Sequence, residues 1–330
     1  MYPATLAPTP AYLPRPELSR ALPSGRQARI ARVKSALLRA AYATLDREGF
    51  VQVMPSTLTT LSGACGEPGT LIPVSLNGER SYLRQTAQLH LEPLMRMLGR
   101  VYSIGPSFRA ERADDERHLT EFTLLEAEAA GMDLQGLMDV MESLVASMVT
   151  GALQAERDGL LELGANVEAL EQMAQLPFAR VTYDEAIVAL QDAGYFIEWG
   201  EDLRSSHELA LTEIAGGPLF VTHYPLELRF FTMKVDRSDP RRALCCDLLL
   251  PRVGEVMGAS ETECDPAVLE GKLYASKGVR QIEDLGGSAT DYAWYIEMHK
   301  QSSGQQAGFG MGFERLVRAV CGLSSVAECV

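Results

Sequence analysis

Apolar side chains recur at intervals of three and four residues in two long segments of the chain. Residues 26–48 carry such a stripe and end at Gly49, which predicts an amphipathic helix. Residues 50–54 predict a short strand that ends before Pro55. Residues 133–156 carry a second stripe, rich in methionine, which predicts a helix packed in the core.

Further along, apolar residues alternate with polar ones around a charged segment. Residues 101–104 precede this segment and residues 122–125 follow it, while residues 109–121 are polar or charged. The pattern predicts two antiparallel strands joined by a long loop, and such loops inside compact domains tend to be functional. More strands are predicted at 219–225, 228–235, 243–251, 253–258 and 307–312. Because their connections are not regular βα units, we predict an α+β fold with an antiparallel β-sheet flanked by helices.

The chain is predicted to consist of a short arm and one large domain. Residues 1–25 hold six prolines, which remove amide donors and predict an extended or loosely packed arm. Residues 26–330 are long enough for a substantial core, since 46% of the chain is hydrophobic. Within this domain, residues 157–180 predict a short helical linker or insertion.

Charge and cysteine usage narrow the class of protein. A net charge of -14 and a pI near 4.9 argue against a broad nucleic-acid surface, although a local basic patch would still allow tRNA as a partner. The six cysteines and five histidines form no CxxC pair and no HExxH, so we expect reduced thiols and no structural zinc. The sequence has no apolar run long enough to span a membrane and no apolar signal core. We therefore expect a cytoplasmic protein without a membrane partner.

The charged segment gathers positive charge in an acidic chain. Arg109, Arg112, Arg117 and His118 lie close together in the sequence. A local cationic cluster of this kind suits a phosphate group. A solvated hairpin tip with self-paired charges explains the same pattern on physical grounds, so both interpretations stay open at this point.

A glycine-rich segment near the C-terminus predicts a second wall for a ligand. Gly308, Gly310 and Gly312 alternate along a predicted strand, which clears one face for a flat ligand or for another backbone. Arg315 follows one turn into the next helix, where a guanidinium can reach a phosphate. Tight packing at the end of a strand is the alternative explanation of these glycines.

Two carboxylates complete the candidate site. Asp247 and Glu255 lie on neighbouring predicted strands. Hard oxygen ligands in this arrangement suit Mg²⁺ that bridges ATP phosphates. Each acid taken alone would be an ordinary strand residue.

Three segments together resemble the catalytic domain of class II aminoacyl-tRNA synthetases of the aspartyl and asparaginyl type. Residues 108–128, with FRAE and RHLTEFTLLEAE, resemble motif 2, and GFGMGFER at 308–315 resembles motif 3. The helix, strand and proline at 26–55 resemble motif 1, which implies a homodimer formed through this segment. The arm is too short for the anticodon-binding β-barrel of these enzymes. We therefore expect a free-standing, asparagine-synthetase-like paralogue.

The resemblance implies an ATP site and a role for each matching residue of the loop. It implies that Arg109 is catalytic, binding the α-phosphate and stabilising charge at the phosphorus. It places Glu111 near the adenine or the substrate amine, and Arg117 or His118 on the γ-phosphate. It also implies that Phe122 stacks on the adenine.

On the other side of the nucleotide, the resemblance implies that Gly310 and Gly312 flank the adenine and ribose. Arg315 is then the second catalytic arginine and holds the γ-phosphate. Asp247 and Glu255 correspond to the pair of Mg²⁺ ligands. Together these roles imply that a carboxylate attacks the α-phosphate, which gives an acyl adenylate and pyrophosphate.

For the amino acid, the resemblance implies a pocket with three polar contacts. Glu67 would face the substrate ammonium, and Gln85 and Gln88 would lie in the pocket. A surface glutamate in a glycine-rich loop is the alternative for Glu67.

Three further pocket positions depart from the pattern of the family. Leu91 stands where aspartyl enzymes carry a lysine, and Thr262 stands where both kinds usually carry an arginine. Gln306 stands where the family usually carries the histidine of a PH pair. Two cations that would face a carboxylate are lost, so we infer that free aspartate is not bound in the ordinary way. We expect an altered, neutral or larger side chain in the substrate.

We therefore predict an ATP-dependent ligase that forms an aminoacyl adenylate. We predict that it passes the acyl group to ammonia, an amine or a carrier without tRNA. An aminoacyl-tRNA ligase of the aspartyl or asparaginyl kind is the first alternative. The second is a non-catalytic, nucleotide-binding regulatory paralogue, which the intact Arg109, Glu255 and Arg315 oppose.

Overall fold

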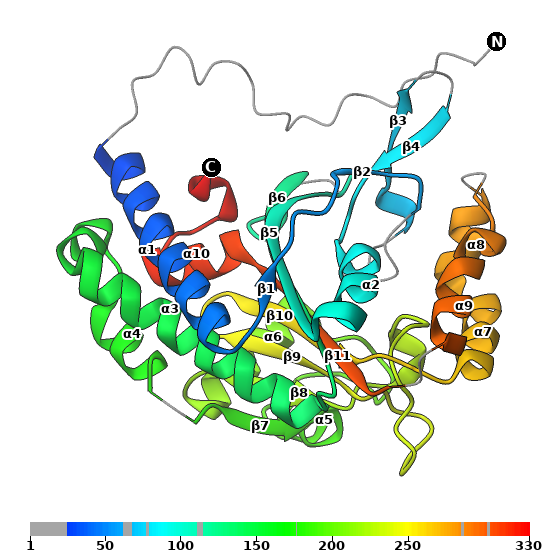
Figure 1. Cartoon of the computed structure of the whole chain (residues 1–330). Helices are drawn as coiled ribbons and strands as arrows, with labels where there is room; N and C mark the ends of the chain where they lie inside the picture. The colour runs from blue at the N-terminus through cyan, green and yellow to red at the C-terminus, as the bar shows by residue number, and fades with distance from the viewer. Residues whose placement is uncertain are drawn as a thin grey trace.

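An eight-stranded sheet runs through the centre of the protein (Figure 1). The structure, a computed structural model, describes residues 25–61, 68–76, 79–110, 115–175, 177–284, 287–301 and 304–330. The strands of the large sheet, in spatial order, are β1 (Val51–Gln52), β5 (Arg100–Phe108), β6 (Glu121–Ala130), β11 (Gln306–Gly312), β10 (Gly254–Glu261), β9 (Cys245–Leu250), β8 (Leu219–Thr222) and β7 (Ala179–Thr182).

Most neighbouring strands of this sheet are antiparallel, which confirms the predicted fold class. The exceptions are the outer pairs, β1 with β5 and β7 with β8, which run parallel. The hairpin predicted around the charged loop is also confirmed, because β5 and β6 pair from Arg100 with Ala129 to Phe108 with Glu121. The charged loop therefore joins the ends of β5 and β6, which form the longest strand pair among the described strands of the sheet.

One face of the sheet is covered by α1 (Gly25–Arg47), α3 (Leu134–Leu163) and α10 (Phe313–Cys321). The apolar residues that predicted α1 are buried between α1 and α3. The burial of their apolar surface is the main contribution that stabilises α1 in the folded protein. Helix α3 starts at the capping carboxylate of Asp133 and ends at Gly164, which is left-handed. Residues 157–180 form the end of α3, the short helix α4 (Val167–Met173) and the start of β7.

Helix α3 is long and strongly apolar. It is the only helix of the described residues that is long and apolar enough to cross a membrane by those two criteria. However, 61% of its most apolar window is buried inside the protein. Helices α1 and α10 and the sheet lie against it, so α3 is a core helix.

The opposite face of the sheet is only partly covered by helices. Helices α5 (Tyr183–Asp192) and α6 (Ser205–Ala215) pack over β7, β8 and β9 with an apolar cluster of their own. Helix α2 (Gln88–Leu98) packs against β5 and β6. Helices α7 (Pro266–Ala275), α8 (Lys277–Asp284) and α9 (Ala293–Gln301) pack together around an apolar cluster of their own. A small sheet contains β2 (Leu58–Thr59), β4 (Glu79–Leu83) and β3 (Ile72–Leu76) in that order.

The strand predicted at 228–235 is wrong. Residues Leu226–Leu228 form a 3₁₀ turn, and only isolated bridges at Met233 and Val235 follow it. The side chains of this segment point in different directions: Phe231 packs among α7, α8 and α9, while Phe230 and Met233 line a pocket. The apolar residues of this segment therefore contact the helices α7, α8 and α9 on one side and the pocket on the other, and the segment does not form a strand of the sheet.

Candidate active site

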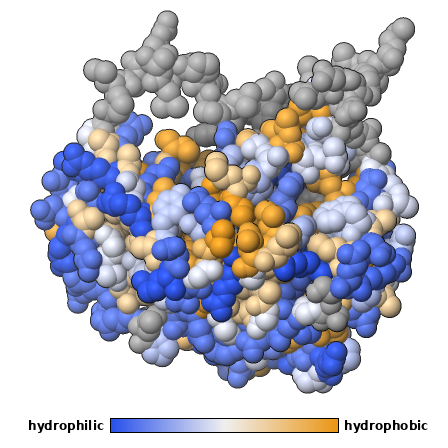
Figure 2. Space-filling view, in the orientation of Figure 1, coloured by the Kyte–Doolittle hydropathy of each residue, from blue (hydrophilic) through white to orange (hydrophobic). Residues whose placement is uncertain are grey.

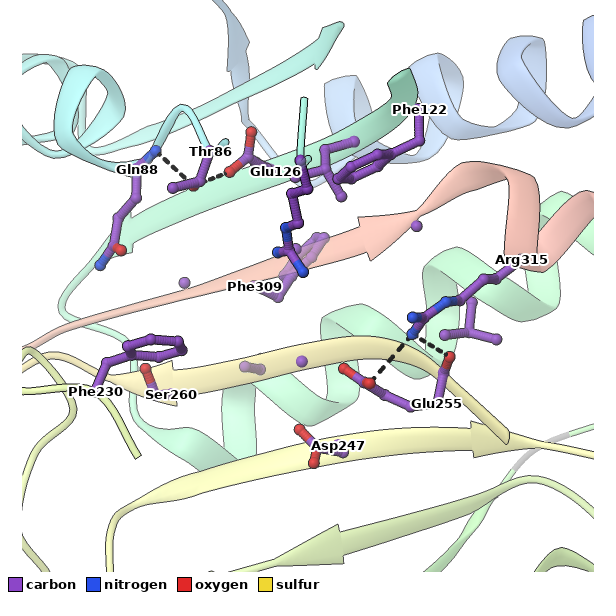
Figure 3. A pocket seen from close by; sticks show the side chains of 18 of the residues that line it. Thr86, Gln88, Phe122, Glu126, Phe230, Asp247, Glu255, Ser260, Phe309 and Arg315 are labelled. Carbon is purple, nitrogen blue, oxygen red and sulfur yellow. Dashed lines mark hydrogen bonds and ion pairs between the residues drawn. The ribbon is translucent and has the colours of Figure 1, made fainter. Parts of the chain in front are cut away.

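A cavity of about 250 Å³ opens on the face of the sheet opposite α3 (Figure 3). Strand β6 contributes Phe122, Leu124, Glu126 and Glu128 to its lining. These residues alternate, so the two-residue period of a strand puts all four on one face. Further lining residues come from β9, β10 and β11, from the starts of α2 and α10, and from the loops around residues 117 and 230.

Five basic side chains line the cavity. They are Arg109, Arg117, His118, Arg229 and Arg315. The guanidinium of Arg109 lies 5.5 Å from the ring centre of Phe122, which is a cation–π contact. Arg315 Nη2 lies 3.4 Å from His118 Nε2. The structure thus brings together residues from the charged loop and from the glycine-rich segment.

The two basic groups Arg117 and His118 of the charged loop are each held by a carboxylate. The His118 ring lies 2.7 Å from Asp115, and Arg117 forms an ion pair of 2.7 Å with Glu208 on α6. Burial is the main cause that raises the pKa of Glu208, and Arg117 opposes it. The loop is therefore not a tip with charges paired only among themselves, because α6 fixes one of its arginines.

The carboxylates of Asp247 and Glu255 approach the same point of the sheet. A methyl group at Gly258 would lie 3.4 Å from Asp247 Oδ1 and 3.5 Å from Glu255 Oε1. Each acid has an arginine partner: Arg229 is 2.8 Å from Asp247, and Arg315 is 3.1 Å from Glu255. The pair thus presents adjacent oxygens next to two guanidinium groups.

The two acids differ in their electrostatic environment. Burial raises the pKa of Asp247 to about 6, with Arg229 opposing the shift and Glu255 adding to it. Burial would also raise the pKa of Glu255, but Arg315, Arg229 and Arg117 together lower it. Within the described ranges, no group of three or more His, Cys, Asp or Glu residues is suited to hold a metal ion. The pair fits a Mg²⁺ that takes its remaining oxygens from a ligand or water.

The three glycines of β11 lie along the floor of the cavity. A methyl group at Gly310 would find its nearest atom, Cγ of Glu126, at 3.9 Å. A methyl group at Gly308 would lie only 2.2 Å from Glu128 Oε2. The floor is therefore open at Gly310, while at Gly308 a carboxylate occupies the space that a side chain would need.

The predicted amino-acid contacts fall into two sets. Gln88 and Thr262 line the cavity, whereas Gln85, Gln306 and Leu91 lie outside it. The side chain of Gln85 donates to Thr70 Oγ1 at 2.9 Å. Leu91 is fully buried in a small apolar cluster with Ala87, Met95 and Val101, because α2 turns it toward β5. The predicted contacts Glu67 and Glu111 lie outside the described residues.

Two of these glutamines, Gln88 and Gln306, donate hydrogen bonds to one buried acid, Glu92. Gln88 Nε2 donates to Glu92 Oε1, and Gln306 Nε2 donates to Glu92 Oε2, both at 2.8 Å. The hydroxyl of Tyr295 donates to both oxygens, at 3.0 and 2.9 Å. The side chain of Gln306 is therefore linked to the cavity through Glu92 and Gln88, and its backbone carbonyl accepts from the amide of Thr262 at 3.0 Å.

The sequence interpretation missed several residues of this site, among them the charged residues Glu126, Glu128 and Arg229 of the lining and Glu208, the partner of Arg117. A signal for the two glutamates existed, since they continue the alternation of Phe122 along β6. No local signal marks Arg229 or Glu208, because their partners come from distant strands and loops.

The fold and the cavity together define the class of protein. The family of class II tRNA synthetases (D, K and N) matches residues 20–330. The chain therefore belongs to this family.

The relatives make the comparison more specific. The asparagine–tRNA ligase of Thermococcus gammatolerans is 40% identical over 306 residues, which are 92% of this chain and 68% of that protein. The crystal structure of asparaginyl-tRNA synthetase from Pyrococcus horikoshii complexed with asparaginyl-adenylate matches with a TM-score of 0.85 and 36% identity. That match covers 96% of this chain and 74% of the other. The Entamoeba histolytica asparaginyl-tRNA synthetase matches with a TM-score of 0.82, 27% identity, and coverage of 93% and 67%.

These relatives overturn the predicted transfer to ammonia, an amine or a carrier. That prediction rested on the short N-terminal arm, the acidic net charge and the altered positions Leu91, Thr262 and Gln306. The three positions concern the side chain of the amino acid and do not identify the acyl acceptor. The relatives are asparagine–tRNA ligases, so the comparisons support the stated alternative, aminoacylation of tRNA.

Proposed function

We propose that this protein is an aminoacyl-tRNA ligase that activates an amino acid with ATP and transfers it to tRNA. The observation that carries the proposal is one cavity that brings Arg109, Arg315 and the acid pair of Asp247 and Glu255 to the same face of the sheet. The arginines suit a triphosphate, and the glycines of β11 leave room for a flat base. Asparagine, the amino acid named for the relatives, is the first substrate to test.

In this proposal, positioning and charge neutralisation produce the rate enhancement. Arg109 neutralises charge on the α-phosphate as the carboxylate of the amino acid attacks it, and pyrophosphate leaves. Phe122 and Arg315 lie on opposite sides of the adenine. Asp247 and Glu255 would hold a Mg²⁺ ion, which would supply further charge neutralisation at the phosphates.

The remaining cations of the loop complete the nucleotide site. Arg117 and His118 contact the terminal phosphates, and Glu208 and Asp115 fix their orientation. We also propose that Glu111 contacts the nucleotide and Glu67 the substrate ammonium. The 3′-terminal hydroxyl of tRNA then attacks the acyl carbon of the adenylate, and AMP leaves.

We further propose a homodimer formed through the segment at 26–55, in an intracellular setting. Tyr42, Val51, Met54 and Leu58 are exposed although they are apolar, and Met54 is 94% exposed. Figure 2 shows hydrophobic residues gathered in the middle of the face where Figure 1 draws β1 and α2. A large exposed apolar patch favours contact with another protein surface.

Two assays test the activity. We expect asparagine-dependent ATP–pyrophosphate exchange, and attachment of labelled amino acid to tRNA. We expect Arg315→Ala and Glu255→Ala each to lower exchange by about 100-fold or more, since each removes charge stabilisation at the phosphates. The control Arg157→Ala removes an exposed arginine that pairs with Glu171 far from the cavity, and should leave exchange unchanged.

The outcomes separate the alternatives. Exchange without any charging of tRNA would contradict the proposed acceptor. Tight ATP binding without exchange for any amino acid would contradict catalysis altogether. Full exchange in Arg315→Ala or Glu255→Ala would contradict the assignment of the nucleotide site.

A further inference from the structure

The charged loop is held from outside the cavity by the C-terminal end of the protein. The backbone carbonyl of Glu116 accepts from the amide of Val326 at 3.0 Å and from Arg318 Nη1 at 3.4 Å. Arg318 Nη2 also donates to Glu116 Oε2 at 3.0 Å. One loop residue therefore receives three hydrogen bonds from α10 and from the segment that follows it.

Glu116 directly precedes the two loop residues that line the cavity, Arg117 and His118. The backbone of these residues is compact, because Asp115 Oδ1 accepts from the amide of Arg117 at 2.9 Å and from that of His118 at 3.0 Å. A shift of Glu116 would therefore move the backbone of both basic residues.

Arg318 lies one helical turn after Arg315, so the two side chains are neighbours on the surface of α10. Arg315 lines the cavity and pairs with Glu255. Arg318 lies outside the described lining of the cavity and pairs with Glu116. Helix α10 thus carries one arginine that faces the ligand site and a second that holds the loop.

An arginine at position 318 is electrostatically unfavourable in itself. Its side chain is only 9% exposed, whereas that of Glu116 is 68% exposed, and its Nε is buried without a hydrogen-bond partner. Burial is the main cause that lowers the pKa of Arg318; Glu116 opposes this shift, while Arg117 and Arg315 add to it. An apolar side chain of similar length would avoid these costs, so the packing of α10 does not require this charge.

The segment that holds the loop is itself fixed to the core. Val326 is 2% exposed and lines the cavity. The ammonium group of Lys34 on α1 donates to the carbonyl of Cys329 at 3.0 Å, and the thiol of Cys329 donates to the carbonyl of Glu314 at 3.4 Å. The loop is therefore attached to a part of the protein that is tied to both α1 and α10.

We propose that Arg318 is a positioning residue for the nucleotide, which holds Arg117 and His118 through Glu116 at the place where they meet the terminal phosphates of ATP. The inference rests on the proposed function, because that function places the terminal phosphates on Arg117 and His118. Arg318 touches no phosphate itself. Without it, part of the binding free energy of ATP is spent on ordering the loop.

The test compares ATP with AMP, each measured by calorimetry with the whole protein and Mg²⁺. AMP lacks the terminal phosphates, so its binding does not use Arg117 or His118. We expect Arg318→Met to weaken ATP by about fivefold or more and to change the affinity for AMP by less than about twofold. Arg318→Lys keeps the charge but not the planar group of donors, so it should restore only part of the lost affinity.

A second variant separates positioning from the effect of charge alone. Arg318→Met removes a positive charge, which by itself disfavours an anionic ligand. Glu116→Ala removes a negative charge, so simple electrostatics predicts tighter binding of ATP. The proposal predicts the opposite, a loss of about threefold or more, because Arg318 then loses its carboxylate partner on the loop. The double variant should bind ATP about as weakly as Arg318→Met, since both changes break the same contact.

Arg180→Met is the matched control. Arg180 also pairs with carboxylates, those of Asp139 and Glu142, but it lies on β7 outside the described lining of the cavity. This variant should change neither affinity. Thermal melting completes the comparison, and we expect Arg318→Met to melt within about 3 °C of the natural protein or above it.

Three results would overturn the inference. They are unchanged ATP affinity in folded Arg318→Met, equal weakening of ATP and AMP, and tighter binding of ATP by Glu116→Ala. Because Glu116 is exposed, Glu116→Ala decides the question even where Arg318→Met does not fold. Failure of the proposed function looks different: the variants would still change ATP binding as expected, while neither pyrophosphate exchange nor charging of tRNA would be seen.

Discussion

At the scale of single residues, Glu128 carries an electrostatic cost inside the folded protein. Its Oε2 atom is buried without a hydrogen-bond partner. Burial is the main cause that raises the pKa of this carboxyl, and the carboxylates of Glu92 and Glu126 raise it further. Because a buried carboxylate oxygen without a donor is unfavourable, we expect Glu128 to destabilise the folded protein.

Because Glu128 has a raised pKa in the folded state, the stability difference between the natural protein and Glu128→Gln should depend on pH. The pKa of Glu128 is raised in the folded state, from an ordinary value of 4.5, mainly by burial. Stability from this group is therefore present below pH 4.5 and is lost as the pH rises through the folded-state pKa. We expect Glu128→Gln to melt about 2–4 °C higher than the natural protein at pH 8, with a difference that shrinks toward pH 4.5.

Melting curves measured by circular dichroism at several pH values test this. Glu213→Gln serves as the control, since an exposed glutamate should give no such trend. Parallel melting profiles of Glu128→Gln and the natural protein across this pH range would show that Glu128 carries no such penalty.

At the scale of elements, the glycines of β11 differ in the space that surrounds them. Gly308 lies beneath the carboxylate of Glu128, whereas Gly310 borders open space in the cavity. The strand is therefore more sensitive to a side chain at one glycine than at the next, although both face the same way.

We expect Gly308→Ala to destabilise the protein by about 1–3 kcal/mol, since its methyl group would force the buried carboxylate to move. Gly310→Ala should cost less than about 1 kcal/mol, but it should weaken ATP binding, because the methyl group projects into the cavity. Urea denaturation and nucleotide titration measure the two effects. Adding Glu128→Ala to Gly308→Ala should relieve most of the clash. Equal destabilisation by both alanines would contradict this difference.

The elements also show how far the sequence alone could lead. Periodicity predicted α1 and the β5–β6 hairpin, because each signal comes from residues that are close in the chain. Arg109, Arg117, Arg315 and the glycines of β11 were placed in the site for the same reason. The network around Glu92 was not, since its donor Gln306 lies 214 residues away. The pairing of Arg229 with Asp247 was missed because the strand predicted at 228–235 does not form.

At the scale of the whole molecule, the main apolar core and the cavity lie on opposite faces of the large sheet. Helices α1, α3 and α10 cover one face with the main apolar core, and the cavity occupies part of the other face. The exposed apolar residues around β1 belong to neither layer. They lie at the edge of the sheet, where a second copy can add its own edge.

A charge at this edge tests the proposed homodimer. We expect Met54→Asp to convert a dimer into a monomer in light scattering, because an ionised carboxylate would be buried in an apolar contact. Phe196→Asp is the matched control: Phe196 is 89% exposed, but it lies between α5 and α6, away from β1. A natural protein that is monomeric at micromolar concentration, or a dimer that survives Met54→Asp, would contradict the proposed interface.

The order of α1 and α3 along the chain has a consequence for protein synthesis. Helix α3 is apolar enough to be mistaken for a membrane segment, and α1 is one of the elements that hide it. Ribosomes add roughly 5–20 residues per second, so α1 leaves the exit tunnel on the order of ten seconds before α3 is complete. A growing chain therefore already has a cover for its most hydrophobic helix. In a rearranged gene that encodes α1 last, the nascent chain would expose α3 to chaperones and to the membrane-targeting machinery.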